Sequence, residues 1–96
     1  MANTPEAKVK RKVSQLLKRA EECYYFMPVQ SGYGSSTLDY LGISKGRGFA
    51  IETKAPGKEP TMRQKIIIRE ILESGGKIFV ISGEPKQYEE LRIWLF

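Results

Sequence analysis

The start of the chain places its apolar side chains at helical spacing. One face of the expected helix collects Val9, Val13, Leu16, Leu17 and Ala20. Apolar residues that recur at this spacing share one side of an α-helix. Thr4 and Pro5 stand where an N-cap and a first helical residue are expected. The pattern therefore predicts a helix over residues 5–22.

Three short runs in the middle of the chain have the composition of strands. They are YYFMPV at 24–29, TLDYLGI at 37–43 and GFAIETKA at 48–55. A polar, glycine-rich loop, QSGYGSS, follows the first run, and SKGRG joins the other two. We expect the second and third runs to form a β-hairpin, because a short glycine-containing turn separates them.

The end of the chain alternates helix and strand again. Thr61 opens a second helical segment, TMRQKIIIREILESGG, which Gly75 and Gly76 close. A buried strand, KIFVIS, and a last helix, GEPKQYEELRIWLF, follow. The predicted order is α-β-β-β-α-β-α. Together with a length of 96 residues, it indicates one α/β domain over residues 1–96.

Composition narrows the chemistry that is open to this chain. It has 16 Lys and Arg against 11 Asp and Glu, a net charge of +5 that suits a polyanionic partner such as DNA. Histidine is absent and cysteine occurs once, which excludes histidine metal sites, Ser-His triads and disulfide frameworks within one chain. The charged start, MANTPEAKVKRKV, predicts no signal peptide, no membrane contact and an intracellular, cytoplasmic location. Any catalysis must therefore use carboxylates, lysines and oxygen-binding metals.

The hairpin brings three charged residues together if its turn is centred on Lys45 and Gly46. A two- or four-residue loop then pairs Asp39 with Glu52 across the strands. Strand alternation puts Glu52 and Lys54 on one face, while Phe49, Ile51 and Thr53 point to the other. A three-residue loop shifts the register by one and breaks this alignment.

Two carboxylates held this close repel each other unless a cation lies between them. Mg²⁺ or Mn²⁺ relieves the repulsion through oxygen ligands, acidifies its bound water and neutralises a phosphoryl group. Lys54 adds a compact positive charge for orienting the water or stabilising the transition state. The cluster of Asp39, Glu52 and Lys54 therefore predicts metal-dependent hydrolysis of phosphodiester bonds.

Two further residues have both a structural and a functional interpretation. Glu6 shares the helical sector of the apolar residues and points inward, so it is either a first-turn acid that complements the helix dipole or a third carboxylate reaching the metal. Gln64 completes a capping box with Thr61, and an amide there is also suited to binding a phosphate or the attacking water. Both interpretations of each residue remain open.

Basic residues in three places are expected to contact nucleic-acid phosphates. They are Lys10, Arg11 and Lys12 on the first helix, Lys45 and Arg47 at the hairpin turn, and Arg63 at the start of the second helix. Lysine and arginine side chains supply the electrostatic part of DNA binding. For the helical residues the alternative is a solvated polar face.

The stretch LDYLGISKGRGFAIETKA resembles the core of the PD-(D/E)xK nuclease superfamily. From Glu6 to about residue 82 the chain resembles, more closely, a stand-alone VRR-NUC domain of the kind found in phages. Asp39 matches the aspartate of that family, Glu52 and Lys54 its Glu-x-Lys, and Gln64 its glutamine. The family's upstream Gly-x-Pro is absent, and Leu38 precedes the aspartate.

The resemblance implies a restriction-endonuclease-like core, a mixed sheet flanked by helices. It implies Mg²⁺ or Mn²⁺ bound by Asp39, Glu52 and the backbone carbonyl of Thr53, with Glu6 and Gln64 completing the catalytic set. It also implies a DNA endonuclease of replication or repair that acts on four-way junctions or other branched DNA. Such short phage forms act as homodimers, within a bacterial host.

Two functions other than a nuclease are considered for this chain. The alternative to a nuclease is a non-catalytic basic DNA-binding module in which Glu52 and Lys54 form a surface ion pair, although an ion pair needs no second carboxylate such as Asp39. An RNA-binding domain is disfavoured, because Tyr24, Tyr25 and Phe26 are adjacent rather than alternating.

The last helix carries much apolar surface, in Tyr88, Leu91, Trp94, Leu95 and Phe96. We therefore expect it or the first helix to form a twofold dimer interface.

Overall fold

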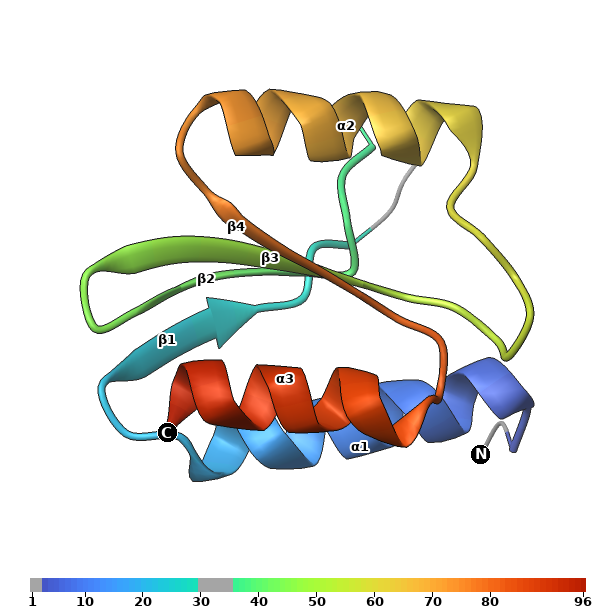
Figure 1. Ribbon diagram of the computed structural model, residues 1–96, viewed down its shortest axis with the longest axis horizontal. Helices are drawn as coiled ribbons and strands as arrows, with labels where there is room; N and C mark the ends of the chain where they lie inside the picture. The colour runs from blue at the N-terminus through green and yellow to red at the C-terminus, as the bar shows by residue number, and fades with distance from the viewer. Residues whose placement is uncertain (1–2, 30–35) are drawn as a thin grey trace.

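The computed structural model of the chain, which describes residues 3–29 and 36–96, confirms the predicted order of elements. Three helices and a four-stranded mixed sheet alternate as α-β-β-β-α-β-α, an α/β arrangement (Figure 1). Helix α1 is Pro5–Arg19, α2 is Met62–Glu73 and α3 is Pro85–Leu95. Of the glycine-rich loop at 30–36, only Ser36 is among the described residues.

The sheet has the strand order β1-β2-β3-β4. The strands are Cys23–Phe26, Tyr40–Ser44, Arg47–Thr53 and Lys77–Ile81. The pairs β1–β2 and β2–β3 are antiparallel, whereas β3 and β4 run parallel. Parallel neighbours need a crossover connection, and α2 provides it between β3 and β4.

The turn of the β2–β3 hairpin has the geometry that the sequence predicts. Lys45 and Gly46 both have positive φ values, 51° and 79°. Two such residues form the type I′ turn, whose twist matches that of the flanking strands. Ser44 and Arg47 are partners beside the turn, and Tyr40 pairs with Ile51. The two-residue loop is confirmed, and the register brings Asp39 opposite Glu52 just beyond the paired strand.

The helix starts are set by side-chain caps. The Thr4 hydroxyl accepts a hydrogen bond from the Ala7 N–H at 3.1 Å, and Pro5 begins α1. Thr61 and Gln64 form the predicted capping box of α2. Helix α1 ends at Arg19 rather than at the predicted position 22, because the backbone is already extended at Ala20, with φ −73° and ψ 134°. Glu22 then has a left-handed φ of 55° as the chain turns into β1.

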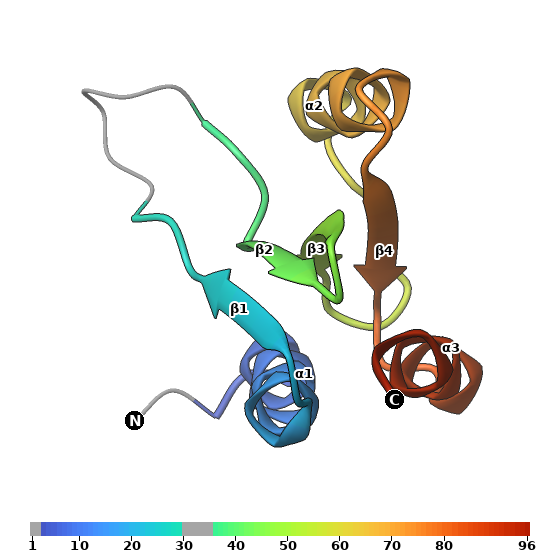
Figure 2. The ribbon, with the colours of Figure 1, turned by 90° about the vertical axis from the view of Figure 1, so that its left-hand side faces the viewer.

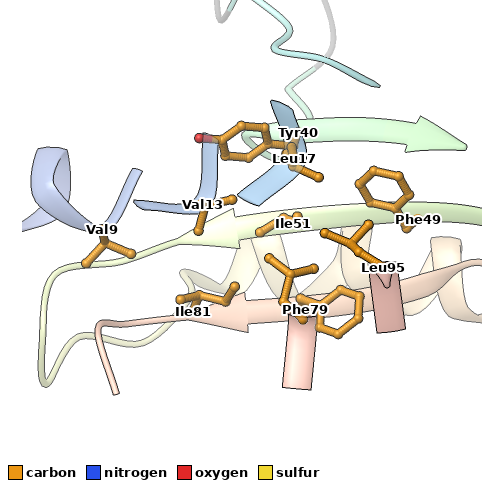
Figure 3. Close-up of a cluster of buried hydrophobic side chains, with 10 residues drawn as sticks. Val9, Val13, Leu17, Tyr40, Phe49, Ile51, Phe79, Ile81 and Leu95 are labelled. Atoms are coloured by element: carbon orange, nitrogen blue, oxygen red, sulfur yellow. The ribbon is translucent and has the colours of Figure 1, made fainter. Parts of the chain in front are cut away.

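One face of the sheet carries the hydrophobic core. Helices α1 and α3 cover this face, while α2 lies on the other (Figure 1). The packed side chains come from both helices and from three strands (Figure 3), namely Val9, Val13, Leu17, Tyr40, Phe49, Ile51, Phe79, Ile81, Leu91 and Leu95. Alternation along β3 sends Phe49 and Ile51 into this core and leaves Glu52 for the opposite face.

The opposite face is only half covered. Helix α2 lies over β4, and none of the residues of α2 is buried. Among the described residues, no helix lies over β1 and β2 on this side (Figure 2). Tyr24, Phe26 and Ile43 are exposed on those two strands. In α3, by contrast, Leu91 and Leu95 are fully buried. Leu91 and Leu95, two of the apolar residues expected in surplus on the last helix, are therefore core, whereas Phe96 is 55% exposed.

Candidate active site

Asp39 and Glu52 meet where β2 begins and β3 ends. The backbone N–H of Asp39 donates a hydrogen bond to Oε1 of Glu52 at 3.3 Å. The two residues come together because each lies one position beyond the Tyr40–Ile51 pair of the hairpin, and because β3 continues to Thr53. The predicted pair of carboxylates is thus present on the same hairpin end.

Thr53 fixes one side of the Asp39 carboxylate. Its N–H and its hydroxyl both donate to Oδ2 of Asp39, at 2.9 and 2.7 Å. Strand alternation had assigned the Thr53 side chain to the face opposite Glu52. Its hydroxyl reaches Asp39 because the aspartate precedes the first paired residue of β2, where the pleat no longer sets its direction. The role of the Thr53 carbonyl as a metal ligand stays a prediction.

Glu52 is a buried carboxylate, with a residue exposure of 3%. Burial, reinforced by the nearby charge of Asp39, raises the pKa of Glu52 from 4.5 to about 7. Lys54 opposes this shift, since its Nζ lies 3.7 Å from Oε2 of Glu52. The Lys54 side chain is only 15% exposed. The pair is therefore not the surface ion pair that the non-catalytic alternative assumed.

Gln64 has the structural role that the sequence predicted and also contacts Glu52, while its binding of a phosphate or of the attacking water stays a prediction. Its Oε1 accepts the Thr61 N–H at 2.9 Å and completes the cap of α2. Its Nε2 donates to Oε2 of Glu52 at 2.8 Å. One amide thus connects the start of α2 to the buried carboxylate and holds Glu52 in a single orientation.

Glu6 lies near the site without joining the carboxylate pair. It is half-buried on the first turn of α1, and its charge adds a minor contribution to the raised pKa of Glu52. Within residues 3–29 and 36–96, no three Asp, Glu, Cys or His side chains are grouped closely enough to hold a metal ion. The donor set is therefore the Asp39–Glu52 pair, with Glu6 at its margin.

Lys10 is the site residue that sequence reasoning misplaced. It was grouped with Arg11 and Lys12 as a phosphate-contacting surface, yet its Nζ lies 3.7 Å from Oδ1 of Asp39. Its position in the sequence contained the clue. Lys10 follows Glu6 by one helical turn, so a helix that turns Glu6 toward the site also turns Lys10 toward it.

Lys45 and Arg47 have partners at the other end of the hairpin. The Lys45 Nζ donates to the carbonyl of Leu95 at 2.6 Å, and Arg47 donates to the carbonyl of Trp94 at 3.0 Å. The Arg47 guanidinium also lies 4.1 Å from the centre of the Trp94 ring. Both cations therefore hold the C-terminus of α3, about 20 Å from the carboxylates along β3.

Arg63, which the sequence predicts to contact DNA phosphates, lies beside the site. It lines a pocket of about 250 Å³ together with Asp39, Thr61 and Gln64. Lys12 and Arg11 are exposed on α1, with the Lys12 Nζ 4.5 Å above the Tyr88 ring. Of the six basic residues expected to contact DNA, only Lys10 and Arg63 line or touch the carboxylate cluster.

Comparison with protein-family models and with curated proteins assigns no family to the chain. No model of a known protein family matches it, and no curated protein matches it either. Among the described residues, no helix is both long and apolar enough to cross a membrane. Functional assignment therefore depends on the geometry of the site.

Proposed function

We propose that this chain is a metal-dependent DNA endonuclease that hydrolyses phosphodiester bonds at the Asp39–Glu52 pair. The observation that carries the proposal is a buried glutamate with a pKa near 7, placed against a second carboxylate and beside Lys54. Perturbed carboxylates of this kind are typical of catalytic sites, because a merely structural site avoids like charges in a buried place.

The oxygen atoms of the pair suit a hard divalent cation. Each carboxylate has one oxygen that is firmly held, Oδ2 of Asp39 by Thr53 and Oε2 of Glu52 by Gln64. The other two oxygens have weaker partners among the described residues, at 3.7 and 3.3 Å. Mg²⁺ or Mn²⁺ binds through such carboxylate oxygens, and bound there it would supply an acidified water and charge neutralisation.

The protein's own residues would position the reaction. In hydrolysis, a water oxygen bonds to phosphorus as a phosphorus–oxygen ester bond breaks, the water gives up a proton and the departing oxygen gains one. Lys54 is oriented by Glu52 and presents a positive charge to the phosphoryl group. Gln64 keeps Glu52 fixed while the charge on phosphorus grows. Arg63 lines the adjacent pocket, where it is suited to a neighbouring phosphate.

Fold and charge support the same proposal. A mixed four-stranded sheet in the order α-β-β-β-α-β-α is the arrangement expected of a restriction-endonuclease-like core. The net charge of +5 favours a polyanionic substrate. A chain of this size orients a branched DNA more readily as a twofold pair, so the proposal includes a homodimer. Exposed apolar side chains are available to such an interface on the sheet, in Tyr24, Phe26 and Ile43, and at the end of α3, in Ile93 and Phe96.

The alternative, a non-catalytic DNA-binding module, explains the charge but not the site. A module that only binds phosphates has no use for a buried glutamate beside a second carboxylate, because negative charge repels DNA. The burial of Glu52 and Lys54 therefore favours the nuclease over the binding module.

A panel of labelled DNAs tests the proposal. Linear, nicked, flapped and four-way substrates are incubated with the protein in Mg²⁺, Mn²⁺, Ca²⁺ or EDTA. We expect cleavage in Mg²⁺ or Mn²⁺, with a preference for branched substrates, and paired incisions on a four-way junction if the dimer forms. Binding without cleavage of any substrate in either metal would favour the alternative module.

A further inference from the structure

Lys10 enters the site from a different element than the other charged residues. Asp39, Glu52 and Lys54 all belong to the hairpin or its immediate flanks, whereas Lys10 belongs to α1. Its Nζ lies 3.7 Å from Oδ1 of Asp39, and its side chain is 35% exposed. The ammonium group thus contacts a buried carboxylate on one side and solvent on the other.

The backbone of Lys10 is held in place independently of its side chain. The hydroxyl of Tyr40, which directly follows Asp39, donates to the carbonyl of Lys10 at 2.9 Å. The same hydroxyl is 2.7 Å from the hydroxyl of Ser14. Burial raises the pKa of Tyr40 to about 12, so this phenol stays protonated and remains a donor. Helix α1 is therefore fixed against β2 at this level, while the flexible lysine side chain can move.

Lys10 occupies the Asp39 oxygen that a metal would need. Oδ2 of Asp39 already accepts two hydrogen bonds from Thr53, so Oδ1 is the oxygen that remains for a cation. In the metal-free protein, Lys10 and Lys54 balance the two carboxylates one to one. A divalent cation adds two positive charges, which the ammonium of Lys10 would then repel. The side chain has solvent beside it into which to swing.

We propose that Lys10 alternates between two partners, Asp39 when the site holds no metal and a DNA phosphate when it does. This inference rests on the proposed function. The charges agree with it: two carboxylates, two lysines and one divalent cation leave an excess of about two positive charges, which matches the roughly dianionic transition state of phosphodiester hydrolysis. Lys10 thus neutralises Asp39 in the metal-free protein and binds the DNA substrate once the metal is present.

Titration calorimetry with Mn²⁺, in the absence of DNA, tests the first half of the exchange. Lys10→Ala should bind Mn²⁺ about 3- to 10-fold more tightly than the wild type, because the competing ion pair is gone. Lys10→Arg, which keeps the charge, should bind Mn²⁺ no more tightly than the wild type. Lys18→Ala, on the exposed last turn of α1, is the matched control and should leave Mn²⁺ affinity unchanged.

The salt dependence of DNA binding tests the second half. In Ca²⁺, the slope of log affinity against log salt should be smaller in magnitude by about 0.9 for Lys10→Ala than for the wild type, since one phosphate contact is lost. In EDTA the two slopes should agree, because Lys10 then contacts Asp39. Equal Mn²⁺ affinities or equal slopes in Ca²⁺ would overturn this inference alone. A wild type that binds no Mn²⁺ would overturn the proposed function and this inference with it.

Discussion

The β2–β3 hairpin carries charge at both of its ends, and the two ends use it differently. At the turn, Lys45 and Arg47 donate to the last carbonyls of α3, where a helix presents partial negative charge. At the open end, Asp39 and Glu52 lie together in a buried place, and the pKa of Glu52 rises to about 7. At the turn, positive side chains meet the partial negative charge of a helix end. At the open end, two negative carboxylates lie side by side.

The difference separates structural charge from functional charge. Cations at a helix C-terminus lower the free energy of the fold without any ligand. Ionised carboxylates that are buried against each other raise the free energy of the folded chain unless a cation joins them. The hairpin retains such a pair at its open end, where Glu52 is only 3% exposed, and this arrangement agrees with the divalent cation that we propose. We therefore expect substitutions at the open end to affect turnover and those at the turn to affect stability.

The largest effect is expected on turnover at the open end. Asp39→Asn, Glu52→Gln and Lys54→Ala should each slow DNA cleavage by roughly a thousandfold or more, because each removes charge that the transition state needs. Single-turnover kinetics on a labelled branched DNA measures this. Glu59→Gln, an exposed carboxylate in the loop after β3, is the matched control and should cleave normally. A Lys54→Ala protein with wild-type turnover would return the lysine to a structural role.

A pH effect on stability of about 3 kcal/mol should follow from Glu52 in metal-free buffer. Its pKa is 4.5 when unfolded and about 7 when folded. Between these pH values the folded chain binds more protons, so the free energy of unfolding falls as the pH rises. Urea unfolding of the wild type and Glu52→Gln measures it, and the variant should lack most of this decrease. Identical pH profiles would mean that Glu52 titrates normally.

A smaller loss of stability is expected at the turn. Arg47→Ala should lower the free energy of unfolding by about 1–2 kcal/mol, because it removes one hydrogen bond and one cation–π contact with Trp94. Thermal unfolding measures this, with the exposed Arg69→Ala on α2 as the control. An Arg47→Ala protein of full stability with a flatter salt slope for DNA binding would assign Arg47 to the DNA contacts expected from sequence.

The smallest effect concerns Arg63, which lines the pocket beside Asp39. Arg63→Ala should weaken DNA binding a few-fold and reduce the magnitude of the salt slope by about 0.9, as expected for one lost phosphate contact. Fluorescence anisotropy at several salt concentrations measures the slope. Lys86→Ala on the exposed start of α3 should leave it unchanged. An unaltered slope for Arg63→Ala would limit the DNA contacts to other residues.

Local chemistry made part of this site predictable from sequence. The Lys45-Gly46 turn fixed the register and thereby placed Asp39 opposite Glu52. The capping box of α2 located Gln64, since an N-cap and its third residue lie close in the chain. Such features depend on neighbours within a few residues, and a single sequence contains them.

Long-range packing made the rest unpredictable. Lys10 belongs to the site only because Tyr40 and the core hold α1 against β2. Arg47 contacts α3 only because that helix packs under the same sheet. Helical spacing relates Lys10 to Glu6 but does not show which residues the two meet, and no local pattern relates Arg47 to α3. Leu91 and Leu95, expected as part of an apolar surplus on α3, complete the core for the same reason.

The central claim, metal-dependent cleavage of DNA at Glu52, is tested most directly by measuring cleavage before and after metal is added to the same protein sample. The wild type and Glu52→Gln are stripped with EDTA, mixed with a labelled branched DNA, and then given Mg²⁺ or Mn²⁺ in excess. The account predicts no cleavage before the metal is added, rapid cleavage by the wild type afterwards, and almost none by the variant. Cleavage in EDTA, or equal cleavage by the two proteins in metal, would contradict it.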